Sequence, residues 1–72
     1  MGKLYYDPGK EGLLDKLKAR ITEYRERTHR EPKYCAVNIH QLENEISVLG
    51  VMIKPVRWIL KNYIWITDAK DE

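Results

Sequence analysis

The chain has 72 residues, of which 43% are hydrophobic and 33% are charged, and its formal net charge is +2. This balance is typical of a small globular domain and excludes an intrinsically disordered chain. A single cysteine excludes an intrachain disulfide, and no apolar run approaches the roughly 18 residues of a membrane span. We therefore expect one cytoplasmic domain over residues 1–72, without a membrane partner.

The first nine residues contain a short apolar stretch, which ends at the structure-breaking run Asp7-Pro8-Gly9. We expect residues 1–9 and 68–72 to be flexible. The pattern leaves open whether Tyr5 and Tyr6 pack back on the core or stay loose.

The next segment has the apolar period of a helix. Apolar residues recur at three- and four-residue steps at Leu13, Leu14, Leu17, Ile21 and Tyr24. This spacing places them in one sector about 100° wide of an α-helix. Pro32 ends the segment, because the residue before a proline is pushed out of the helical region. The sequence predicts a long helix over residues 11–30.

Residues 33–39 alternate in the manner of a strand, with Cys35 and Val37 on one face. Asn38 followed by Gln41 matches a helix-capping pattern, which predicts a short helix over residues 40–46. Further strands are predicted at 50–54 and 62–67, with a turn at residues 61–62. Pro55 is expected to end the earlier of these strands, because proline cannot continue a central ladder.

These elements predict the α+β fold class: a long N-terminal helix packed on a small three-stranded sheet, in the order α-β-α-β-β. The order strand, short helix, strand suggests that the first two strands pair in parallel.

Residues 50–67 contain both tryptophans and most of the large apolar side chains. Tyr63 and Trp65 share one face of the predicted last strand, and Trp58 lies in the connection before it. With Arg57 they have the composition of a protein-interface hot spot. The alternative is that both faces of the sheet are covered and these rings belong to the core.

The predicted long helix is basic, and it suggests a second binding surface. Its positive side chains are Lys16, Arg20, Arg25, Arg27 and Arg30. A phosphate backbone would accept such a stripe. Acidic residues interrupt it, however, so the alternative is a solvated helix face whose long side chains cover the edges of the core.

Catalytic and metal-binding patterns are not evident. Cys35, His40 and Glu43 are the nearest to such a set, but Cys35 alternates with apolar residues as a buried structural cysteine does. A structural zinc site usually has four ligands, and no second cysteine is present. We therefore predict no enzyme activity, no cofactor, no metal and no small-molecule substrate.

One longer pattern resembles a known segment. It consists of PKYCAVN at residues 32–38, a predicted short helix with Leu42, GVMI at 50–53, Pro55 and a final IWI at 64–66. This pattern resembles the C-terminal segment of tailed-phage major capsid proteins and small prophage-encoded proteins. The resemblance covers residues 32–67, and the chain is far too short for a capsid subunit. It implies a phage or prophage origin and a structural or interaction role, and it supplies no binding residues.

Two hypotheses for function follow. The leading one is a non-enzymatic interaction or assembly protein that binds a protein partner or a second copy through Trp58, Tyr63 and Trp65. The second is a small accessory protein that binds nucleic acid through the basic helix.

Overall fold

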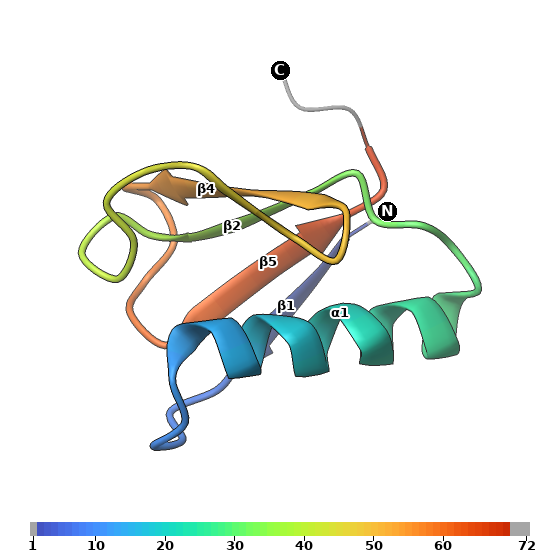
Figure 1. The fold of residues 1–72 in the computed structure, drawn as a ribbon, viewed down its shortest axis with the longest axis horizontal. Coiled ribbons are helices and arrows are strands. Elements are labelled where there is room, and N and C mark those ends of the chain that lie inside the picture. The colour runs from blue at the N-terminus through green and yellow to red at the C-terminus, as the bar shows by residue number, and fades with distance from the viewer. Residues whose placement is uncertain (1, 70–72) are drawn as a thin grey trace.

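A computed structural model describes residues 2–69 of the chain. Its elements are β1 (Gly2–Tyr6), α1 (Leu13–Thr28), β2 (Tyr34–Asn38), β3 (Ile46–Val48), β4 (Val51–Val56) and β5 (Tyr63–Thr67). The strands form one five-stranded mixed sheet in the order β1-β5-β2-β4-β3. Only β2 and β4 pair in parallel, and the other neighbouring strands are antiparallel. α1 lies along one side of this sheet (Figure 1).

The core lies between α1 and the sheet. α1 contributes Leu17, Ile21 and Tyr24, which are almost completely buried. The strands contribute alternate residues from the same face, and these are Cys35, Val37, Val48, Val51, Ile53, Ile64 and Ile66. The helix expected over residues 11–30 therefore forms, but it begins at Leu13 and ends at Thr28. His29 terminates it in the left-handed region, at φ 55°.

The predicted three-stranded sheet is wrong, because the sheet has five strands and the element order is β-α-β-β-β-β. Residues 2–6, for which we expected flexibility, form β1. β1 pairs with β5 from Gly2↔Thr67 to Tyr6↔Tyr63. The adjacent Tyr5 and Tyr6 show no clear alternation, so the sequence does not predict a strand here. The strand forms because β5 supplies a complete row of backbone partners.

The predicted short helix over residues 40–46 is also wrong, because turns and bends lead directly into β3. The Asn38 side chain does not cap a helix: its Oδ1 accepts a hydrogen bond from the His40 N–H, at 2.8 Å. This contact closes a local turn instead. β3 and β4 then form a hairpin through Leu49 and Gly50, at φ 52° and 79°, values typical of the two-residue turns that match strand twist.

Pro55 does not end a strand, contrary to prediction, since β4 continues to Val56. The Ile39 N–H donates to the Val56 carbonyl oxygen at 3.0 Å, so the backbone N–H and C=O groups of Val56 point toward β2. Because the backbone groups of successive residues in a strand point to opposite sides, the Pro55 nitrogen points away from β2. β3 pairs with β4 only as far as Ile53. The missing N–H of Pro55 therefore points to an open edge, where a proline is tolerated.

Two further predictions are confirmed: β2 and β4 pair in parallel, and residues 61–62 form a turn. Near the C-terminus, Asp68 accepts a hydrogen bond from the Arg30 guanidinium at 2.9 Å. The expectation of flexibility for residues 70–72 lies outside the described residues. Between residues 2 and 69, no helix is both long enough and apolar enough to cross a membrane.

Candidate interaction surface

The sheet has an open face on the side away from α1. In β5, Ile64 is buried on the α1 side, whereas Tyr63 and Trp65 project on the open face and are half-buried. The antiparallel register places Leu4 opposite Trp65 and Tyr6 opposite Tyr63. Four large side chains from the two strands are therefore neighbours on the open face.

The aromatic rings on the open face differ in exposure: Trp65 is half-buried, whereas Tyr6 is exposed. The rings of Tyr6 and Tyr63 have centroids 4.9 Å apart and are tilted by 39°, a favourable aromatic pair. The indole of Trp65 lies over Gly2, where a Cβ atom would overlap the ring. Gly2 thus allows Trp65 to lie close to the sheet, and Tyr6 remains 61% exposed.

The connection between β4 and β5 completes this surface. The Asn38 side chain, buried on the open face, donates from Nδ2 to the Ile59 carbonyl at 2.7 Å. Ile59 is buried, while Trp58 and Leu60 on either side of it are 63% and 70% exposed. A depression of about 260 Å³ is lined by Leu4, Trp58, Ile59, Leu60 and Tyr63.

We define the aromatic face by Leu4, Tyr6, Trp58, Leu60, Tyr63 and Trp65. None of these side chains carries a charge, and β1 to β5 contain no acidic residue. The charged side chain that the strands place on the open face is Lys54, which lies over the Tyr34 ring at 5.9 Å and is separated from Trp65 by Ala36 of β2. Recognition at the aromatic face would therefore depend on apolar contact rather than on charge.

The structure divides the four residues predicted to form an interface. Trp58 and Tyr63 line one depression, and Trp65 is their neighbour through Leu4. Arg57 lines a different depression of about 480 Å³, with Asn38, Ile39 and His40. Arg57 is therefore not among the residues that line the depression beside Trp58 and Tyr63, although it precedes Trp58 in the chain.

Sequence reasoning missed Leu4, Tyr6 and Leu60 as surface residues. The run Leu4-Tyr5-Tyr6 does carry the period of a strand, since Leu4 and Tyr6 face outward while Tyr5 packs against the core. Three residues are too few to establish this alternation without knowing their pairing partner.

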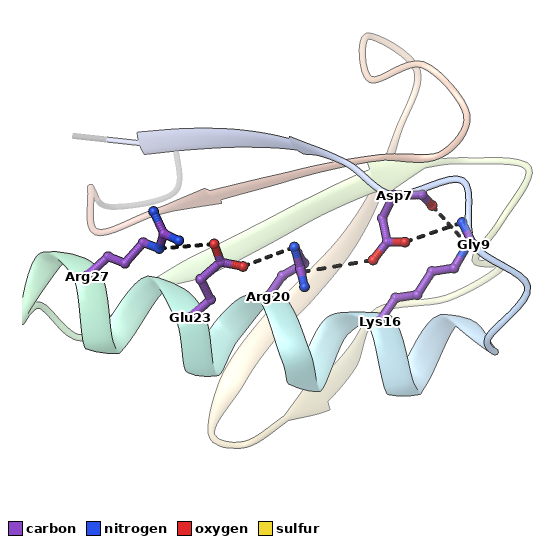
Figure 2. A network of polar contacts seen from close by, with 6 residues as sticks. All are labelled: Asp7, Gly9, Lys16, Arg20, Glu23 and Arg27. Carbon is purple, nitrogen blue, oxygen red and sulfur yellow. Dashed lines mark hydrogen bonds and ion pairs between the residues drawn. The ribbon is translucent and has the colours of Figure 1, made fainter.

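The five basic residues predicted to bind nucleic acid all have partners within the chain. Lys16 Nζ donates to the Asp7 carbonyl at 2.9 Å, and Arg20 contacts both Asp7 and Glu23. Arg27 pairs with the other Glu23 oxygen at 3.1 Å. Figure 2 shows these contacts as a row that joins the β1–α1 loop to the length of the helix.

The two remaining basic residues are held at the end of α1. Arg25 pairs with Glu31 at 2.9 Å and donates to the Leu49 carbonyl at 2.8 Å. Arg30 pairs with Asp68 at 2.9 Å. A phosphate group would have to displace these intrachain acceptors, so the helix offers a weaker site than its positive charge suggests.

Cys35 is enclosed in the core and its thiol is free. Burial raises the pKa of the Cys35 thiol to about 12, so the group stays protonated at neutral pH. A protonated, inaccessible thiol is neither a nucleophile nor a metal ligand. Within residues 2–69, no three His, Cys, Asp or Glu side chains are grouped so that they could hold a metal ion.

No protein-family model, curated protein or solved structure matches this chain. The phage resemblance stays a prediction, and the short helix that it implies after Asn38 is replaced by turns and β3.

Proposed function

We propose that this protein is a non-enzymatic interaction module that self-associates through the aromatic face. The observation that supports this is the exposure of Leu4, Tyr6, Trp58 and Leu60, each more than half exposed and gathered at one end of an uncovered sheet face. Exposed apolar groups that lie together are typical of interaction sites, and burying them on association is favourable.

A second copy is the occupant that the surface supports best. The aromatic face extends to β1, the outermost strand of the sheet, so a second molecule can continue both the face and the sheet. The face is uncharged, which gives no preference for a charged partner. A chain of 72 residues also has a small core, which self-association can supplement.

The test is the solution mass by light scattering over a dilution series from about 1 µM to about 1 mM, a range that covers weak association. The wild type is expected to form a dimer that dissociates on dilution. Leu60→Ser should raise the dissociation constant at least about tenfold, since that loss corresponds to one buried leucine. Leu14→Ser is the matched control, because Leu14 is 52% exposed on α1, and its dissociation constant should not change.

A monomer at every concentration would overturn the proposal. So would an equal effect of Leu60→Ser and Leu14→Ser, since association would then not involve the aromatic face. A monomer that binds nucleic acid with a steep salt dependence would instead favour the basic helix.

We also propose the cytoplasm as the working compartment. The free Cys35 thiol supports this, because the fold needs no oxidising environment. Fractionation of cells that express the protein tests it, and recovery outside the cytoplasm would contradict it.

A further inference from the structure

The edge of β1 that faces away from β5 carries backbone N–H and C=O groups that can be assigned to particular residues. The Asp7 N–H donates to the Asn62 carbonyl at 2.7 Å, which continues the β1–β5 register by one pair. Hydrogen-bonded and non-hydrogen-bonded pairs alternate in an antiparallel ladder. Lys3 and Tyr5 therefore bond to β5, while the N–H and C=O groups of Gly2, Leu4 and Tyr6 point away from it. Among the described residues, no backbone partner covers these groups.

We propose that β1 of a second copy pairs with this edge in antiparallel fashion, about a twofold axis at Leu4. The outward groups then form the pairs Leu4 with Leu4, Gly2 with Tyr6, and Tyr6 with Gly2. Each pair exchanges two N–H···O=C bonds. The result is a continuous ten-stranded sheet, and the α1 helices of the two copies lie on the same side of it. This inference rests on the proposed self-association and specifies its geometry.

The residues of β1 select this register over its neighbours. Moving the axis to Lys3 would place two lysines directly opposite each other, which is destabilising. Moving it to Tyr5 would bring Pro8 opposite Gly2, and proline has no N–H to donate. Only the axis at Leu4 uses every outward group of β1 and avoids both conflicts.

The side chains on the open face also fit this pairing. Leu4 would meet its own copy across the axis as an apolar pair. Tyr6 would lie across from Gly2 of the second copy. Trp65 of that copy already lies over Gly2, so the Tyr6 ring would meet an aromatic neighbour.

The opposite edge of the sheet is less suited to pairing. β3 has three residues, and the turn beside it is held by the Arg25 guanidinium on the Leu49 carbonyl. Short edge strands of this kind resist strand addition. β1 has five residues, and the side chains of Leu4 and Tyr6 are exposed beside its free groups.

A disulfide cross-link tests the register. In a hydrogen-bonded antiparallel pair the opposing Cα atoms are about 5.5 Å apart, within the range that a disulfide spans. Oxidised Leu4→Cys should therefore give a covalent dimer. Tyr6→Cys is the matched control, because the two copies of residue 6 would be about four strand positions apart, well over 7 Å. The wild-type protein is the control for cross-linking through Cys35, which is buried.

A proline substitution tests the hydrogen bonds. The Leu4 N–H points away from β5, so Leu4→Pro should keep the fold while removing a donor from the interface. Its dissociation constant should rise at least about tenfold relative to Leu4→Ala, which truncates the side chain but keeps the N–H. In wild type, the Leu4 and Tyr6 amides should gain protection from hydrogen exchange as concentration rises, whereas Lys3 and Tyr5 should be protected throughout.

The outcomes separate this inference from the proposal on which it rests. A dimer that cross-links equally through residues 4 and 6, or that leaves the Leu4 and Tyr6 amides unprotected, would overturn strand pairing while self-association stands. A monomer under all conditions would overturn both.

Discussion

The indole of Trp65 lies over Gly2 of the neighbouring strand, at a position where any other residue would place its Cβ inside the ring. This relationship joins the N-terminal strand to the last one. It also explains why Trp65 is half-buried on a face that has no helix over it.

The first prediction concerns this contact. Gly2→Ala should lower the free energy of unfolding by about 1–3 kcal/mol, because the indole must move to admit the methyl group. Urea denaturation measures the change. Gly12→Ala is the control, since nothing lies within 4 Å of its added Cβ, and its change should stay within about 0.5 kcal/mol. Equal effects at the two glycines would contradict the packing of Trp65 on Gly2.

The second prediction concerns Asn38, whose side chain joins β2 to the segment that carries Trp58 and Leu60. Asn38→Ala should cost about 2–3 kcal/mol, because the His40 N–H and the Ile59 carbonyl both lose a partner. Urea denaturation measures the loss, and light scattering should also show weaker self-association. The exposed Asn44→Ala should change neither quantity. Wild-type stability in Asn38→Ala would show that the segment is held by other contacts.

The third prediction concerns pH. The Cys35 thiol has an ordinary pKa of 9.0, and burial raises this pKa to about 12 in the folded chain. Below pH 9 the thiol is protonated in both states, so stability is unaffected. Above pH 9 the unfolded chain loses the proton while the folded chain keeps it, so stability falls by about 1.4 kcal/mol per pH unit up to pH 12.

Comparing urea denaturation of wild type and Cys35→Ala between pH 8 and pH 10.5 isolates this contribution. The wild type should lose stability more steeply, whereas the tyrosines, whose pKa values burial also raises, act equally in both proteins. Parallel curves would show that the thiol is not desolvated.

The fourth prediction concerns the ion pairs along α1. Glu23→Gln removes the carboxylate shared by Arg20 and Arg27, but these groups are partly exposed, so the cost should be below about 1 kcal/mol and should shrink in 1 M salt. The control is Glu26→Gln, on an exposed side chain for which the described residues show no ion pair. A large, salt-independent loss would mean that the network is buried more deeply than its exposure indicates.

The amphipathic helix could be predicted because its signal is local. Leu17, Ile21 and Tyr24 recur with the helical period, and the same residues form its buried side. The alternation around Cys35 predicted β2 for the same reason. Composition predicted an aromatic surface of Trp58, Tyr63 and Trp65. It did not predict that Leu4, Tyr6 and Leu60 lie on the same face.

The errors arose where a residue's partner is distant in the sequence. Asn38 has the same local pattern whether it caps a helix or bonds to Ile59, and only the folded chain determines which carbonyl is within reach. Proline is disfavoured in a central strand because it has no N–H to donate. Pro55 is nevertheless tolerated in β4, because β3 pairs with β4 only as far as Ile53 and does not reach residue 55.

The sequence by itself therefore determined the amphipathic helix α1, the apolar faces of its main strands and the absence of an evident catalytic pattern, because these depend on periodicity and residue type. Only the tertiary structure decided that residues 2–6 form an edge strand, that Leu4 and Tyr6 join the aromatic face, and which groups of the chain pair with Lys16, Arg20, Arg25, Arg27 and Arg30. The physical reason is that backbone hydrogen bonds and ion pairs join groups far apart in the sequence. The packing of the helix on one face of the sheet determines which of these groups meet and which remain exposed.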